Sequence, residues 1–182
     1  MKDYDNLLPV ADKEALRIYD HNSAPRKLVG EKLRNVFKKL VTGLKDKNGN
    51  PVNLDDFYFT VSANSQANAF FISSQYTADK KTNIICVTDS LIHILNKEDH
   101  LAAVIAHETG HYIWDQLLGG TNTVYQERFA DINSVDLMIR GGYNPRYVID
   151  MFYRIGDTGN AHAVILMFMV HKDRELKMSK RV

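Results

Sequence analysis

The residues of this sequence best suited to chemistry are two histidines, four positions apart, with a glutamate after the first. His107, Glu108 and His111 form the pattern His-Glu-x-x-His within an apolar run. Residues four apart project from one face of a helix, so both imidazoles can reach one metal ion at about 2.0–2.1 Å. A carboxylate beside the first ligand can take the proton of a zinc-bound water that attacks a carbonyl. The pattern therefore predicts a zinc site for hydrolysis, with Glu108 as general base.

A catalytic zinc ion needs a third protein ligand, and the next predicted helix offers one. Glu127 lies 16 residues after His111, beyond Gly119 and Gly120, which permit a tight reversal of the chain. Asp131 lies on the same helix face as Glu127 and could accept a hydrogen bond from a ligand histidine. The alternative interpretation is two solvated acids on a helix surface. Their position after the His-Glu-x-x-His helix favours a zinc ligand and a residue that supports it.

The elements expected to position these residues are a small sheet followed by helices, an α+β arrangement. We expect a sheet of three strands, or slightly more, and then a helical bundle within a single domain, 1–182. Its parts would be N-terminal helices and a turn (1–56), a core (57–155) and a C-terminal helix (156–182). The predicted strands span 57–61, 69–72 and 83–87, and the predicted helices span about 12–19, 25–41, 89–95, 98–118, 123–140, 145–155 and 163–178.

Composition excludes several classes of protein. The 182 residues carry 23 basic and 22 acidic side chains, a balance that gives no electrostatic footprint for nucleic acid. Cys86 is the only cysteine, so no internal disulfide can form, and its apolar neighbours predict a buried strand residue. The longest apolar run, 163–170, is far shorter than the roughly 20 residues of a membrane span. These features predict a soluble protein, with the cytoplasm favoured and export after removal of a signal or anchor as the alternative. They do not indicate an oligomeric state.

Several segments, taken in order, resemble the gluzincin metallopeptidases of family M48. The resemblance covers roughly 57–155, and five correctly spaced matches are more specific than any one of them. The matching segments are Asn68-Ala69-Phe70, the step from Val87 to Ile92, the run from Glu98 to Glu108, Glu127-Arg128-Phe129-Ala130-Asp131, and the loop from Arg140 to Pro145.

The resemblance implies a zincin-like fold and a zinc-dependent endopeptidase that acts on extended protein or peptide substrates. It further implies that a substrate strand pairs with the edge of the sheet near Asn68, Ala69 and Phe70, where main-chain hydrogen bonds would hold the peptide. The implied site is one zinc ion per chain bound by His107, His111 and Glu127, with Glu108 as general base and Asp131 supporting a ligand.

The chain departs from the family near its C-terminus. Family members typically carry a His-Pro loop with an arginine six residues after that histidine, and these groups stabilise the charge of the transition state. Here Lys172 follows His171, and Arg174 comes three residues later. His171 and Arg174 are therefore weak candidates for this task, alongside His162 and Tyr143. The small size is similar to that of minigluzincins, compact soluble relatives that a terminal segment can hold latent.

Three alternatives to a general endopeptidase stay open at this point. A regulator protease of the ImmA/IrrE type also joins His-Glu-x-x-His to a later glutamate, but it would cut one repressor. A zinc-stabilised module that binds peptides without cleaving them would explain the unusual His171 region. A latent zymogen would behave like that module until a terminal segment was removed. His21, His93 and His100 show no ligand pattern, and we expect them to be structural.

Overall fold

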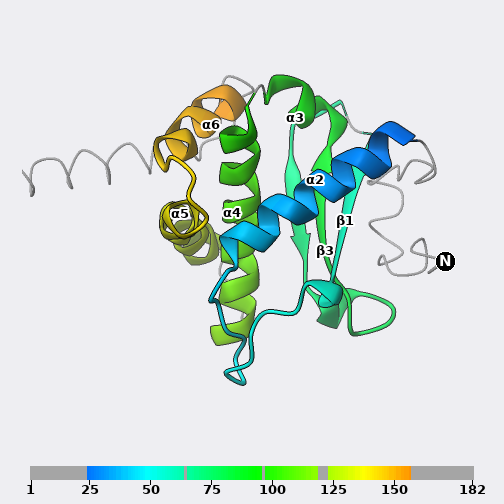
Figure 1. The fold of residues 1–182 in the computed structure, drawn as a ribbon, viewed down its shortest axis with the longest axis vertical. Coiled ribbons are helices and arrows are strands. Elements are labelled where there is room, and N and C mark those ends of the chain that lie inside the picture. Colours follow the sequence, from blue (N-terminus) through cyan, green and yellow to red (C-terminus); the bar gives the residue numbers. More distant parts are fainter. Residues whose placement is uncertain (1–23, 64, 96, 119–122, 157–182) are drawn as a thin grey trace, which may run out of the picture.

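The structure of the protein is a computed structural model, which describes residues 24–63, 65–95, 97–118 and 123–156. One helix precedes three short strands, and further helices follow them, which confirms the predicted α+β class (Figure 1). The elements are α2 (Ala24–Leu40), η2 (Leu54–Asp56), β1 (Phe57–Ser62), β2 (Ala69–Ile72), η3 (Ser74–Tyr76), β3 (Asn83–Thr88), α3 (Asp89–Ile94), α4 (Glu98–Leu117), α5 (Thr123–Arg140) and α6 (Arg146–Gly156).

The three strands form one mixed sheet with β3 in the centre. β1 pairs with β3 in parallel, with Phe57 opposite Asn83, and β2 pairs with β3 antiparallel, with Ala69 opposite Val87. β3 is buried along its whole length, which fits its apolar sequence from Ile84 to Val87. β2 is consequently an edge strand of this sheet, as the substrate-binding hypothesis requires.

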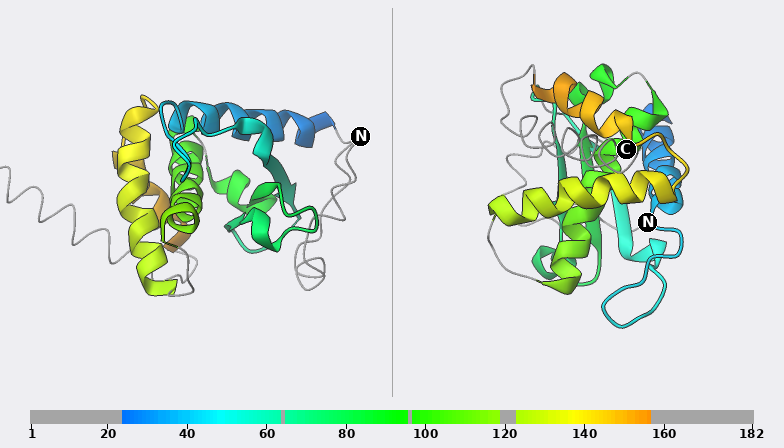
Figure 2. Two further views of the ribbon diagram at one scale, coloured as in Figure 1. Left: turned by 90° about the horizontal axis from the view of Figure 1, so that it is seen from below. Right: turned by 90° about the vertical axis from the view of Figure 1, so that its left-hand side faces the viewer.

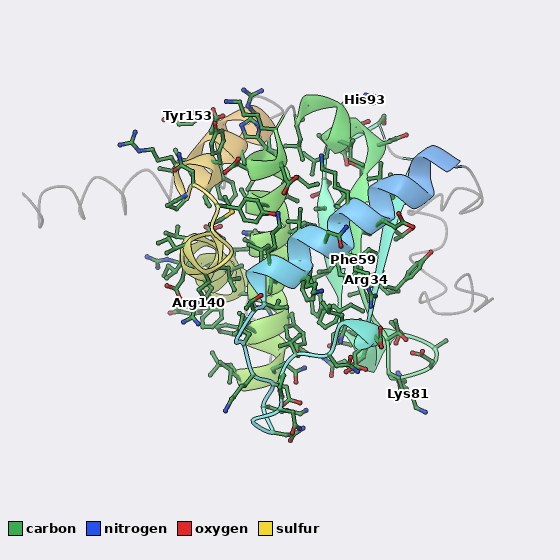
Figure 3. The ribbon with its side chains drawn as sticks, in the orientation of Figure 1. Arg34, Phe59, Lys81, His93, Arg140 and Tyr153 are labelled. Carbon is green, nitrogen blue, oxygen red and sulfur yellow. The ribbon has the colours of Figure 1, made fainter. Side chains whose placement is uncertain are left out.

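One face of the sheet packs against helices. In Figure 1, α2 crosses in front of the strands and then reaches α4. Phe37 of α2 packs against Phe57 and Phe59 of β1, with ring centroids 4.5 Å and 5.2 Å apart. Figure 3 shows Phe59 beneath α2, whereas His93 lies at the outer end of α3. The opposite face carries a smaller cluster that contains Cys86, which is buried and free as predicted.

α4 is the central helix of the molecule and is buried on almost every side. It packs against α2, β2, α5 and α6, so apolar residues surround it, as in a helix within a core. The two views of Figure 2, with Figure 1, show α5 crossing α4 steeply rather than lying along it. Two helices that cross steeply meet over a short length, and the residues at that crossing decide how close the helices come.

The predicted strands and helices within the described residues agree with the observed ones to within one or two residues. The expected helices at about 12–19 and 163–178 lie outside the described residues. Among the helices that the structure describes, none combines the length and the apolarity that a bilayer crossing requires.

Candidate metal centre

His107 and His111 lie one turn apart on α4 and point to the same place. Their Nε2 atoms are 3.2 Å apart, and their side chains are only 12% and 19% exposed. The four-residue spacing therefore does what the sequence predicted and brings two imidazole nitrogens together inside the protein.

Glu127 reaches the same place from α5. Its Oε2 atom lies 3.2 Å from Nε2 of His107 and 3.6 Å from Nε2 of His111. A zinc ion about 2.0–2.1 Å from three ligand atoms in tetrahedral geometry requires those atoms to be roughly 3.3–3.4 Å apart. The three observed separations lie close to that value, so His107, His111 and Glu127 form a group that could hold a metal ion.

Asp131 lies behind His107, one turn after Glu127 on α5. Its Oδ1 atom is 3.0 Å from Nδ1 of His107, and its side chain is only 2% exposed. A carboxylate at Nδ1 favours the tautomer that keeps the proton there, which leaves Nε2 with a lone pair for a metal ion. The structure thus places the carboxylate of Asp131 beside Nδ1 of His107.

Gly110 and Ala130 bring the two helices together, although the sequence reading did not single out either residue. A Cβ atom built on Gly110 would lie 2.5 Å from the Cα atom of Ala130, closer than any real contact. Gly110 lies between His107 and His111, and Ala130 lies between Glu127 and Asp131, so this crossing joins the ligands of the two helices. A glycine within a helix lowers its stability by about 1 kcal/mol relative to alanine. A glycine inside the otherwise apolar helix was therefore the feature of the sequence that could have identified Gly110.

The surroundings of His107 favour a positive charge. Burial lowers the pKa of His107, but the interactions with Asp131 and Glu127 and the charge of Glu108 raise it by more, to about 10. Such a shift means that nearby carboxylates stabilise a cation at this point. Two imidazoles and several carboxylates are also the ligand types that zinc binds, so the residues present fit that ion.

Glu108 follows His107 on α4 and is 6% exposed. Burial raises the pKa of Glu108 to about 7, and the charge of His107 and the backbone N–H of Phe71 oppose that shift. The contact with Phe71 is informative because it ties the carboxylate to β2. The side chain of Glu108 therefore lies where α4 faces the edge of the sheet.

The backbone groups of β2 alternate between β3 and the open edge. The N–H of Thr88 donates to the carbonyl of Asn68, so Asn68 faces β3, and alternation then directs Ala69 and Phe71 outward. The side chain of Asn68 accepts from the N–H of Ala69, 2.9 Å away. Phe71, which the sequence reading placed within the edge but did not single out, thus presents its backbone beside Glu108, whereas the backbone of Phe70 faces β3.

Of the remaining candidates, the structure describes only Tyr143, which lies away from this place. Tyr143 donates from its hydroxyl to Glu98 at the start of α4, and its ring packs beneath the ammonium group of Lys39. These contacts give Tyr143 a packing role at the start of α4. His162, His171 and Arg174 lie outside the described residues.

Comparison with known proteins supports the same interpretation. No curated protein matches the chain. The model of peptidase family M48 matches residues 30–121, half of the 182-residue chain. The matched segment contains most of α2, the sheet, and α4 with His107, Glu108 and His111, whereas Glu127 and Asp131 follow it and are placed by the geometry alone. On this match, the chain belongs to peptidase family M48, a family of zinc-dependent metallopeptidases.

Proposed function

We propose that this protein is a zinc-dependent endopeptidase that hydrolyses peptide bonds in extended protein or peptide substrates. The observation that carries the proposal is the triangle of His107, His111 and Glu127, whose ligand atoms have the separations of a tetrahedral zinc site. Zinc sites of catalytic type keep one position open for water or substrate, and three protein ligands leave that position free.

In this proposal the three ligands hold one zinc ion per chain, and Asp131 keeps His107 in the tautomer that binds it. A bound zinc ion supplies Lewis-acid polarisation of the scissile carbonyl and makes water acidic enough to lose a proton near neutral pH.

Glu108 is the general base in this proposal. Its carboxylate accepts the proton of the attacking water and then returns it to the leaving amine. The side chain is buried beside the ligand row, with the N–H of Phe71 close to it, so burial restricts its position before a substrate arrives. Such preorganisation removes the cost of arranging the base during the reaction.

The substrate would lie along the edge of β2, near Asn68, Ala69 and Phe70. An extended peptide can add a strand to an exposed sheet edge, and the outward carbonyl groups of Ala69 and Phe71 are directed there. This edge lies beside Glu108, so a peptide paired with it would present its backbone to the base and the metal ligands. His171 and Arg174 stay predictions for the transition-state donor.

The first experiment measures zinc in the purified protein by elemental mass spectrometry and tests cleavage of unfolded casein. We expect about one zinc ion per chain and measurable cleavage. Glu127→Ala should lose most of the zinc, because two histidines alone bind it weakly.

Glu108→Gln should keep the zinc and lose cleavage by about 10²–10⁴-fold, because an amide cannot accept the proton. Zinc without cleavage in the parent protein would indicate a binding module, or a latent form if limited proteolysis restored activity. Cleavage of a single repressor and no casein would indicate a regulator protease. A folded protein that binds no zinc after loading would contradict the proposal.

A further inference from the structure

Asp115 extends the row of metal ligands along α4, one turn beyond His111. It lies four residues after His111 and eight after His107, so all three project from neighbouring positions on one side of the helix. Asp115 takes part in neither the ligand triangle nor the contact with Glu108. Its partners come instead from the segment that follows β2.

Two side chains of that segment donate to Asp115. The hydroxyl of Ser73 donates to Oδ2 over 2.8 Å, and the side-chain amide of Gln75 donates to Oδ1 over 2.8 Å. Ser73 is 5% exposed, whereas Gln75 lies on the surface, so the contact spans the boundary between core and solvent. The two carboxylate oxygens of Asp115 thus accept hydrogen bonds from the same turn, η3. One comes from Ser73, which caps the turn, and the other comes from Gln75 within it.

The turn is also fixed to the sheet from the other side. The N–H of Ser74 donates to the side chain of Asn83, the first residue of β3, over 2.8 Å. Ser73 itself caps η3 by accepting from the N–H of Gln75. The end of β2 is therefore fixed to β3 through Ser74 and to α4 through Asp115.

The start of β2 is fixed in a different way, because Asn68 pairs there with Thr88. Between the two ends, β2 has only four residues, and the N–H of Phe71 lies beside Glu108 of α4. Asp115 is thus the charged contact that sets the distance between the C-terminal half of β2 and the row of ligands.

We propose that Asp115 is a positioning residue for peptide cleavage, which holds the edge of β2 at the distance where a paired substrate strand reaches Glu108 and the metal ligands. The inference rests on the proposed endopeptidase function. It assigns Asp115 no contact with the reacting atoms, so its loss should weaken substrate binding rather than remove the chemistry.

The test compares Asp115→Ala with Asp115→Asn in the zinc-loaded protein, using the casein-derived peptide with the fastest cleaved bond. We expect Asp115→Ala to lower kcat/KM about tenfold, mainly through KM, because it removes two hydrogen bonds to a charged acceptor. Asp115→Asn should recover most of the loss, because both hydrogen bonds can re-form. The new amide oxygen can accept from the hydroxyl of Ser73, and the side chain of Gln75 can rotate so that its own amide oxygen accepts from the new NH₂ group. Asp136→Ala, which removes an exposed acid from α5, is the control and should change nothing.

Hydrogen exchange of residues 69–76 supplies a second readout that does not depend on activity. We expect these amides to exchange faster in Asp115→Ala, with zinc content unchanged. If Asp115→Ala does not fold, Gln75→Ala removes one of the two hydrogen bonds at the surface and should raise KM by a smaller factor. An unchanged KM together with unchanged exchange would overturn the proposal, as would equal losses in the alanine and asparagine variants. A parent protein that holds zinc but cuts no casein would contradict the endopeptidase function, and hydrogen exchange would then decide separately whether Asp115 holds β2.

Discussion

His100 and His107 of α4 are each paired with an aspartate from another helix, yet of these two only His107 belongs to the candidate metal centre. His100 and His107 are seven residues apart, about two turns, and so lie on the same side of the helix. Nε2 of His100 lies 2.5 Å from Asp150 of α6, and Nδ1 of His107 lies 3.0 Å from Asp131 of α5.

The two pairs differ in which ring nitrogen meets the carboxylate. His107 uses Nδ1 for Asp131, so its Nε2 atom is directed at His111 and Glu127. His100 uses Nε2 for Asp150, and its Nδ1 atom is buried without a hydrogen-bond partner among the described residues. A histidine whose outer nitrogen is engaged by a carboxylate cannot offer that atom to a metal ion.

The comparison shows that a histidine and a carboxylate in contact do not by themselves make a metal site. The second nitrogen must also be directed at further ligands. At His107 these are His111 of the same helix and Glu127 of α5, whereas around His100 the ring of Tyr147 packs edge-on at 4.8 Å between ring centroids. His100 therefore joins α4 to α6 and is structural, as expected, although its partner was not foreseen.

The largest expected difference is between the variants His107→Ala and His100→Ala. His107→Ala should lose nearly all bound zinc and all measurable cleavage, because only two ligands remain. His100→Ala should keep the zinc and lose about 2–4 kcal/mol of unfolding free energy through the cavity and the lost hydrogen bond to Asp150. Elemental analysis and urea unfolding measure the two effects. Equal loss of zinc in both variants would contradict the distinction.

The next largest effect is expected at the crossing of α4 and α5. Of the two histidine–aspartate pairs, only that of His107 and Asp131 depends on this crossing. Gly110→Ala should cost about 1–3 kcal/mol of stability and weaken zinc binding, because the new methyl group must push α5 and its Glu127 away from α4. Gly30→Ala in α2 is the matched control, because its Cβ would meet only a carbonyl oxygen of Phe59 at 3.4 Å. Thermal unfolding and zinc titration test both variants. If Gly110→Ala is as stable as Gly30→Ala and keeps its zinc affinity, the crossing does not assemble the site.

Asparagine substitutions sharpen the comparison without removing volume. Asp131→Asn should weaken zinc binding about 10–100-fold, because the amide holds His107 less firmly in the required tautomer. Asp150→Asn should leave zinc affinity unchanged. Competition with a chromophoric chelator measures both constants. A weaker zinc affinity in Asp150→Asn would show that α6 also supports the centre.

The smallest expected effect is a pH dependence of stability. The hydrogen bond from His100 holds the pKa of Asp150 below its usual range, and Arg154 acts in the same direction. A carboxyl group with a lowered folded-state pKa stabilises the protein above its unfolded pKa of about 3.9 and loses that contribution as the pH falls through the folded value. Since Asp150 is 47% exposed, the contribution should be at most about 1 kcal/mol.

Urea unfolding between pH 3 and pH 6 should therefore show a shallower loss of stability in Asp150→Asn than in the parent protein. Asp136→Asn, whose exposed carboxylate pairs with Arg140, is the control and should follow the parent. Parallel curves for Asp150→Asn and the parent would show that this pair does not contribute.

Most of the fold could be read from local patterns. The strands at 57–61, 69–72 and 83–87 carry apolar and β-branched residues, and they form with nearly the predicted bounds. The central helix was predictable because Glu98 and Asp99 lie in its first turn and apolar residues fill the rest. The order of the strands was not predictable, because β1 and β3 are parallel neighbours although β2 lies between them in the sequence.

The sequence by itself determined that His107 and His111 meet, because a helix places residues four apart on one face whatever surrounds it. It also identified Glu127 and Asp131 by their spacing, but it could not bring them to the histidines. Only the tertiary structure decided that, through the close approach of Gly110 and Ala130 where α5 crosses α4. The same holds for the difference between His100 and His107, because the choice of ring nitrogen depends on where another helix places its carboxylate, and no local pattern records that position.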